Sequence, residues 1–263
     1  MSFVETNGIH LHHEVSGDGE PLVLISPFAA PAMAWFFQIR AFRKHYRVVT
    51  FDNRGIGKSS KPAGPYTTKM MADDTIGLMD HLGIAQANIL GYSMGSMIAR
   101  EIAIGHPERV RKLILCCVPS EGGSDDAETL RLNAIGQKAN LSESDIQEIM
   151  KIITHVSFKR LPFRLFFGFA SKMFFRSVNT RGVLGQFLAA ESYDMDDKLG
   201  QIKAQTLVIV GTDDNIASES YARKVVGSLP SARLVTVDGG SHTLFMEESG
   251  RFNKEVVDFL KGS

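Results

Sequence analysis

Residues 88–100 read Asn-Ile-Leu-Gly-Tyr-Ser-Met-Gly-Ser-Met-Ile-Ala-Arg. The apolar start predicts a strand, the centre a tight turn, and the end a helix. Glycines two positions to either side of Ser93 remove the β-carbons that would collide where the chain reverses its direction. Ser93 can then present its hydroxyl outward, and the Met94 amide would face the same space at the positive end of the helix. A plain glycine-rich turn is the alternative, but the strand-turn-helix setting favours a serine nucleophile.

The composition is that of an ordinary soluble globular protein, either one large domain or a domain with an insertion. The 263 residues are 44% hydrophobic, and 29 basic residues balance 29 acidic ones. We therefore expect a small, mostly uncharged molecule as partner, and neither nucleic acid nor a membrane. The N-terminus lacks a signal-peptide pattern and no apolar run could cross a bilayer, so the expected location is cytoplasmic. Cys116 and Cys117 are adjacent in an apolar strand pattern, and we expect reduced strand residues without a metal or redox role.

Apolar runs alternate with helical patterns along most of the chain, which predicts an α/β fold with a mostly parallel sheet and helices on both faces. An Asn7-Gly8 pair between two alternating runs predicts an antiparallel hairpin at the start. In such sheets ligands bind beyond the carboxyl ends of the strands, and Ser93 lies at one of these ends. Besides the run before Ser93, the predicted strands are 3–6, 9–15, 21–25, 47–51, 112–118, 206–210 and 233–237, and the predicted helices include 69–82, 96–104 and 221–229.

Two groups of residues invite a metal or phosphate interpretation that we do not favour. His10, His12 and His13 have no matching ligand set nearby, so we expect solvated or edge-strand histidines. The loop at 52–60 is rich in glycine, but it lacks the Walker spacing and a helix directly after it. We therefore expect a structural turn held by Asp52 and Arg54.

The alternation breaks between residues 119 and 204. We predict a core domain formed by 1–120 and 204–263, with a helical cap inserted at 121–203. The cap segment is rich in phenylalanine, and these side chains either form the cap's own core or line an apolar pocket over Ser93. They are Phe158, Phe163, Phe166, Phe167, Phe169, Phe174, Phe175 and Phe187.

Polar residues that follow two late strands could act together with Ser93. His242 follows the last strand in a Gly-Gly-Ser-His context, and Asp213 and Asp214 follow the strand before it. A serine hydroxyl is a poor nucleophile near neutral pH, so a histidine would take its proton and an acid would fix the imidazole tautomer. Adjacent carboxylates cannot both point at one imidazole, and Asp238 lies too close to His242 in the chain. One of the two adjacent aspartates is therefore the expected acid.

Taken together, these motifs resemble the α/β-hydrolase superfamily, in the cap-bearing branch of small esterases, enol-lactonases and carbon–carbon bond hydrolases. The resemblance rests on residues 52–59, the turn around Ser93, residues 106–110, the turn at 211–214 and residues 240–242. It implies an α/β-hydrolase fold with a mostly parallel eight-stranded sheet. It also implies a catalytic triad of Ser93, Asp214 and His242, with Asp214 rather than Asp213 as the acid.

The same resemblance implies an oxyanion hole made by the amides of Phe28 and Met94. Here the chain departs from the pattern, because relatives usually carry His-Gly before the oxyanion residue and this chain has Ser26-Pro27. Proline has no amide hydrogen and restricts Ser26 to extended conformations, so the course of this loop is altered. Loss of one such donor costs about 10²–10³ in rate.

The expected function is hydrolysis of a small, largely apolar ester or lactone through an acyl-serine intermediate, chemistry that needs no cofactor and no metal. A serine argues against haloalkane dehalogenation, which needs a carboxylate that water can later free. Two alternatives stay open: carbon–carbon bond hydrolysis of a β-diketone-like substrate, and a ligand receptor that retains the triad.

Overall fold

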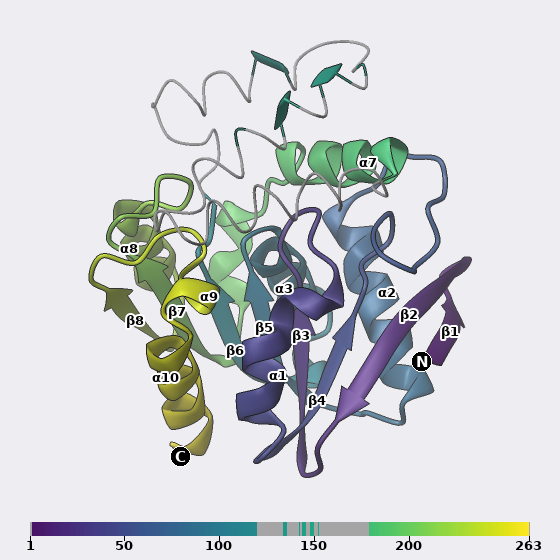
Figure 1. Cartoon of the computed structure of the whole chain (residues 1–263). Helices are drawn as coiled ribbons and strands as arrows, with labels where there is room; N and C mark the ends of the chain where they lie inside the picture. Colours follow the sequence, from purple (N-terminus) through teal and green to yellow (C-terminus); the bar gives the residue numbers. More distant parts are fainter. Residues whose placement is uncertain are drawn as a thin grey trace.

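The computed structural model describes residues 2–119 and 179–262, together with 134–135, 142, 144–145, 148–149 and 152. Its strands are β1 (Ser2–Thr6), β2 (Ile9–Ser16), β3 (Glu20–Ile25), β4 (Tyr46–Phe51), β5 (Ala87–Tyr92), β6 (Val110–Cys116), β7 (Gln205–Gly211) and β8 (Ala232–Val237). They form one sheet in the order β1-β2-β4-β3-β5-β6-β7-β8 (Figure 1). β2 pairs antiparallel with β1 and β4, and every later pair is parallel. The predicted eight-stranded, mostly parallel sheet is confirmed.

The first two strands form the predicted hairpin. Asn7 and Gly8 have φ values of 47° and 74°. Positive φ at both central residues is what a two-residue hairpin turn requires, which explains the Asn-Gly pair. The turn fixes the register in which Thr6 lies opposite Ile9.

Helices cover both faces of the sheet. α1 (Phe36–Phe42) and α10 (Ser249–Lys261) pack against each other on the face nearer the viewer in Figure 1. α2 (Thr68–His81) and α3 (Met94–Gly105) pack together on the other face, and α8 (Glu219–Ser228) packs on β7 and β8. The described residues also form α7 (Thr180–Glu191), α9 (Leu244–Glu247) and the 3-10 helices η1 (Ala32–Trp35), η2 (Pro107–Arg109) and η3 (Asp196–Gln201). None of the described helices is both long and apolar enough to cross a membrane.

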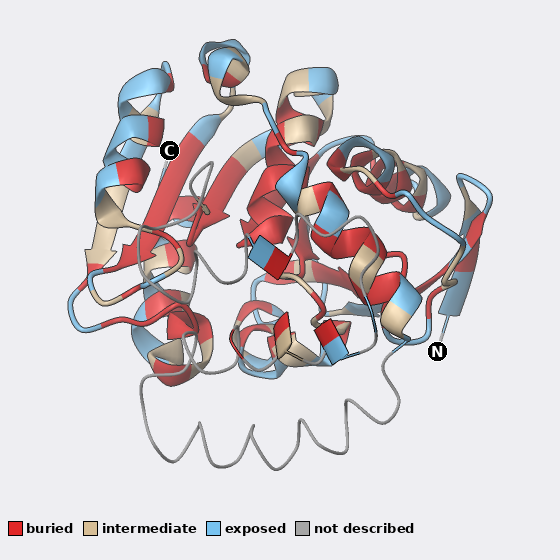
Figure 2. Ribbon diagram, turned by 90° about the horizontal axis from the view of Figure 1, so that it is seen from above, coloured by how far each residue is buried: buried red, intermediate tan, exposed pale blue. Residues whose placement is uncertain are grey.

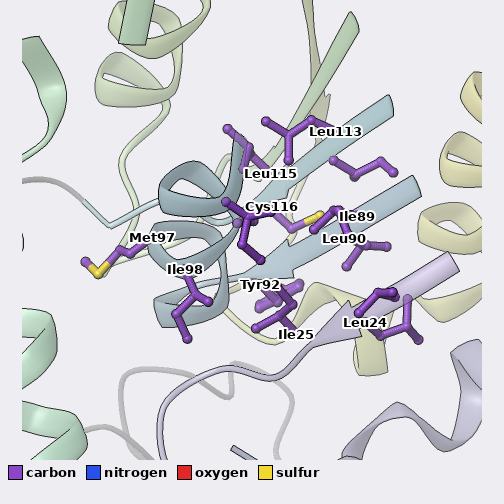
Figure 3. Close-up of a cluster of buried hydrophobic side chains, with 14 of the residues drawn as sticks. Leu24, Ile25, Ile89, Leu90, Tyr92, Met97, Ile98, Leu113, Leu115 and Cys116 are labelled. Carbon is purple, nitrogen blue, oxygen red and sulfur yellow. The ribbon is translucent and has the colours of Figure 1, made fainter. Parts of the chain in front are cut away.

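The core lies on the central strands. All six residues of β5 are buried, because helices cover this part of the sheet on both sides. Ile89 and Leu90 of β5 lie beside side chains of the neighbouring strands β3 and β6 (Figure 3). Viewed from above, the buried residues run through the strands and the inward faces of the helices (Figure 2). This packing holds the carboxyl end of β5, and therefore Ser93, in a fixed place.

The expectation for the N-terminal histidines is wrong for two of the three. His10 is exposed, but His12 and His13 are only 3% exposed. β2 is not an edge strand, since it lies between β1 and β4. The His12 imidazole lies 3.2 Å from an Asp52 carboxylate oxygen on one face, and His13 packs against His81 of α2 on the other.

The expectation for the cysteines needs one correction. Both thiols are free and buried, but β6 ends at Cys116, and Cys117 adopts a positive φ of 46° beyond the strand. Cys117 therefore belongs to the loop at the carboxyl end of the sheet and not to the strand.

The predicted cap falls largely outside the described residues. Of its predicted phenylalanines only Phe187 is described; it lies in α7 and is buried, while Phe158, Phe163, Phe166, Phe167, Phe169, Phe174 and Phe175 lie outside the described residues. α7 lies above the carboxyl ends of the central strands in Figure 1.

Candidate functional site

Ser93 occupies a strained turn between β5 and α3. Its backbone has φ 51° and ψ −120°, a conformation that residues other than glycine rarely adopt. A β-carbon on Gly91 would overlap the Gly95 carbonyl, and one on Gly95 would overlap the Ile25 carbonyl. Only glycine fits at these two positions, so the turn can be this tight and can lift Ser93 beyond the end of the sheet.

His242 joins Ser93 to Asp214. Its Nε2 lies 2.9 Å from Ser93 Oγ, and its Nδ1 lies 3.0 and 2.9 Å from the two carboxylate oxygens of Asp214. The three residues follow β5, β7 and β8, so the parallel strands bring together side chains that are far apart in the sequence. All three side chains are buried. Such a line of serine, imidazole and carboxylate can move a proton from the hydroxyl to the ring.

The Asp214 carboxylate is fixed by its own loop. Its Oδ1 accepts hydrogen bonds from the amides of Ile216 and Ala217 at 2.9 and 2.8 Å. The Asp213 carboxylate instead lies 3.5 Å from the Thr212 hydroxyl, and the Asp213 amide donates to the Gly240 carbonyl. Asp214 is therefore the member of the pair that contacts the imidazole.

A buried phenol holds the His242 backbone. The Tyr92 hydroxyl donates to the His242 carbonyl at 3.0 Å and accepts from the Cys117 thiol at 3.1 Å. Burial raises the pKa of the Tyr92 phenol well above its usual value, as does the neighbouring Cys117. Burial also raises the pKa of the Cys117 thiol, with a further contribution from the charge of Asp214. Both groups are therefore neutral near pH 7, and Tyr92 keeps the proton that it donates to the loop of His242.

The loop that carries Phe28 is held by two side chains from other parts of the chain. Trp35 Nε1 donates to Ser26 Oγ at 3.0 Å, and the Ala29 amide donates to Gln186 Oε1 at 2.9 Å. Gln186 Nε2 donates in turn to the Arg54 carbonyl at 2.9 Å. Gln186, a buried residue of α7, thus connects the Phe28 loop to the loop after β4.

The loop at 52–60 is the structural turn expected from the sequence. The Asp52 carboxylate accepts from the amides of Ala32 and Lys58 at 2.7 and 2.8 Å. Arg54 donates two hydrogen bonds of 2.6 Å to Asp74 of α2. The two residues therefore connect the loop to the backbone at Ala32 and to α2.

Three contacts of the site were not anticipated from the sequence. They involve Tyr92, Cys117 and Gln186. Each depends on which loops are neighbours in space, and the order of the strands in the sheet determines this. For Cys117 a signal existed, because the position follows a strand in the same way as Ser93 and Asp214 do.

The chain is similar to several known proteins. A family model described as alpha/beta hydrolase fold matches residues 20–249. The carbamate hydrolase candidate RutD of Caulobacter vibrioides is 30% identical over 264 residues, covering 96% of both chains. The non-heme bromoperoxidase candidate BpoC of Mycobacterium tuberculosis is 30% identical over 262 residues, covering 96% of this chain and 98% of the relative. Among solved structures, the enol-lactonase from Burkholderia xenovorans is 28% identical with a TM-score of 0.86, covering 99% of this chain and 100% of that one.

Proposed function

The chain belongs to the alpha/beta hydrolase fold family, and on that premise we propose that it is a serine hydrolase of a small, largely apolar carboxylic ester or lactone. The proposal rests on one observation, the line from Ser93 Oγ through His242 to Asp214 with contacts of 2.9 to 3.0 Å. The enol-lactonase with the same fold supports the choice of substrate class.

In the proposed reaction Ser93 Oγ attacks the carbonyl carbon while its proton passes to His242 Nε2. The imidazolium formed is stabilised by the Asp214 carboxylate, and it returns the proton to the leaving alcohol as the acyl-serine forms. A water molecule then attacks the acyl group while His242 takes its proton, and His242 returns that proton to Ser93 Oγ as the bond to the acyl group breaks and the acid leaves. In a lactone the leaving alcohol stays joined to the acyl group through the carbon chain, so the second step releases one hydroxy acid.

The amides of Phe28 and Met94 are the proposed donors to the developing oxyanion. Met94 is the first residue of α3, so its amide has no acceptor in a preceding helical turn and lies at the positive end of the helix. The contacts of Gln186 and Trp35 fix the loop on the other side of the site. Preorganised donors of this kind are typically the largest single contribution to acyl transfer.

An apolar cluster beside the Phe28 loop supports an apolar substrate. The rings of Phe28 and Phe187 lie 6.2 Å apart, centre to centre. Its members come from the Phe28 loop, the loop after β4, α7 and the isolated described residues of the cap segment. They are Ala29, Ile56, Ile135, Ile149, Ile152, Val183 and Phe187, with Phe28 and Leu184 packed against them. Such side chains favour an alkyl or aromatic group over a charged one.

The test is turnover of a panel of short p-nitrophenyl esters, lactones and β-diketones by the wild type and by Ser93→Ala. We expect multiple turnover of esters or lactones, and a loss of at least about 10⁴-fold in the variant. Ser96→Ala is the matched control, because the Ser96 hydroxyl donates to the Ser93 carbonyl and not to His242. Turnover of diketones alone would favour carbon–carbon hydrolysis, and ligand-dependent thermal stabilisation with negligible turnover would favour a receptor.

A further inference from the structure

Cys117 lies between the loops of the proposed triad. β6 is placed between β5 and β7 in the sheet, so the residue after β6 falls between Ser93 and Asp214. One ligand atom each from Cys117, Asp214 and His242 lie within 4.8 Å of one another. The positive φ of Cys117 turns the chain at this point, and the thiol is fully buried.

We propose that Cys117, Asp214 and His242 form a binding site for a thiophilic divalent cation such as Zn²⁺. The bound cation would inhibit the enzyme because Asp214 and His242 of the triad would coordinate it. The binding claim stands on the three side chains alone. The inhibition claim rests on the proposed function. The cation is an inhibitor here and takes no part in hydrolysis.

The donor set fits zinc in both type and spacing. Zinc binds thiolate sulfur at about 2.3 Å and imidazole nitrogen and carboxylate oxygen at about 2.0–2.2 Å, mostly in a tetrahedral arrangement. Ligand atoms of such a site are therefore roughly 3.3–3.6 Å apart. His242 Nδ1 and the Asp214 oxygens are 2.9 to 3.0 Å apart, and all three donors lie within 4.8 Å. Every pair of donors therefore lies within about 1.5 Å of the spacing of a tetrahedral zinc site.

Charge balance also favours a divalent cation in this buried place. A carboxylate and a thiolate together carry two negative charges, and a neutral imidazole adds none. The complex with Zn²⁺ would be neutral, which avoids the large cost of burying an isolated charge. A cysteine that binds zinc does so as a thiolate, so binding releases the proton of the thiol. Sulfur is a soft ligand, which favours Zn²⁺ or Cd²⁺ over Mg²⁺ or Ca²⁺.

Occupation would stop the proposed reaction for a geometric reason. An imidazole and a carboxylate that bind the cation can no longer orient each other. The three protein ligands also leave a fourth tetrahedral position for water, as in zinc sites that remain open.

The first experiment measures binding of Zn²⁺ alone to the full chain by isothermal titration, and of Cd²⁺ by the ultraviolet sulfur-to-metal absorption. Wild type and Ser93→Ala should bind one equivalent of Zn²⁺ with equal affinity, and Cd²⁺ should give the sulfur band. Because Ser93→Ala has no proposed nucleophile, its binding tests the metal site even if the chain proves not to be a hydrolase.

The neighbouring cysteine provides the matched control. Cys117→Ala should weaken Zn²⁺ binding by at least about 10-fold and abolish the Cd²⁺ band. Loss of a residue that only orients a metal ligand already lowers the affinity about 10–100-fold, and loss of the ligand itself should lower it at least as much. Cys116→Ala, one residue away and equally buried, should leave both unchanged. If Cys117→Ala fails to fold, Cys117→Ser keeps the size of the side chain and lacks the thiol. Equal binding by a folded Cys117 variant and wild type, or loss of binding in Cys116→Ala alone, would overturn the proposal.

The second experiment measures ester turnover against Zn²⁺ concentration, with a chelator added afterwards. Inhibition should be reversed by the chelator, and Cys117→Ala should need at least about 10-fold more Zn²⁺ for half inhibition. The same half-inhibiting concentration in wild type and in the variant would contradict inhibition through this site.

Discussion

Gly211 and Gly240 touch at the point where the loop of Asp214 meets the loop of His242. A β-carbon on Gly211 would overlap the carbonyl oxygen of Gly240, and the Asp213 amide donates to that same carbonyl at 3.0 Å. The close approach of the two backbones, which a side chain at Gly211 would prevent, brings the carboxylate of one loop to the imidazole of the other.

Gly211→Ala should therefore push the two loops apart. We expect a fall in kcat of at least about 10-fold because a misplacement of about 1 Å is enough for a large loss, together with a loss of stability of about 1–3 kcal/mol from overpacking. Ester turnover and urea unfolding measure the two effects. Gly227→Ala is the control: Gly227 lies in α8 with open space at its β-carbon position, so alanine there should be neutral or stabilising by up to about 1 kcal/mol. Equal effects of the two substitutions would contradict the role of the close approach.

The adjacent acids give a second prediction. Asp214→Asn should lower kcat about 10⁴-fold, because an amide no longer fixes the imidazole tautomer or stabilises its cation. Asp213→Asn should keep most of the activity, since its carboxylate lies beside Thr212. Steady-state kinetics with one ester give kcat for both variants. A larger loss of kcat in Asp213→Asn than in Asp214→Asn would assign the role of the acid to Asp213.

Gln186 gives a prediction about the loop that carries Phe28. Gln186→Ala leaves the Ala29 amide and the Arg54 carbonyl without their buried partner, at about 1–3 kcal/mol for each group. We expect a lower melting temperature and a fall in kcat larger than any change in KM, since the loss concerns the geometry of the transition state. Gln86→Ala, which removes an exposed side-chain contact to the Glu108 carbonyl, is the control. A change in KM alone would mean that Gln186 contacts the substrate and does not position the loop.

A fourth prediction concerns the pH dependence of stability at Asp196. Burial alone would raise the pKa of this carboxyl, but hydrogen bonds from Tyr221 and Lys224 and the charge of Arg100 together hold it below its usual value. A carboxyl with a lowered pKa contributes stability above its unfolded pKa of about 3.9, and this contribution is lost as the pH falls through the folded value.

Asp196→Asn should accordingly destabilise the protein near pH 7 and flatten the fall in stability below about pH 4. The loss near pH 7 should reach about 3–5 kcal/mol, because the fully buried Arg100 loses its partner carboxylate. Urea unfolding between about pH 3 and pH 7 measures both effects. Asp197→Asn, at the exposed neighbouring position, should follow the wild-type curve. A steep fall that persists in Asp196→Asn would assign the acid sensitivity to another carboxyl.

The sequence was sufficient for the features that depend on local pattern. The Asn7-Gly8 hairpin, the glycines around Ser93 and the apolar run of β5 each follow from a few neighbouring residues. The rule that ligand sites lie at strand ends then places Ser93, Asp214 and His242 at one end of the sheet. It did not distinguish Asp214 from Asp213 without the family resemblance, because their orientations depend on loop backbone.

What the sequence did not reveal depends on contacts between distant segments. His12 and His13 are buried because α2 and the loop after β4 cover opposite faces of β2, and β2 itself carries no sign of this. Gln186 reaches a backbone amide 157 residues earlier in the chain. Contacts of this range are decided by the packing of whole elements, so no local pattern predicts them.

The most direct test of the central claim is to locate the covalent bond. We would treat the protein with a fluorophosphonate ester, which serine nucleophiles attack, and map the adduct by tandem mass spectrometry. Our account predicts one adduct on Ser93 of the wild type, and none on Ser93 of His242→Ala during the same exposure. Modification of another residue in the wild type, or no modification of an enzyme that hydrolyses esters, would contradict it.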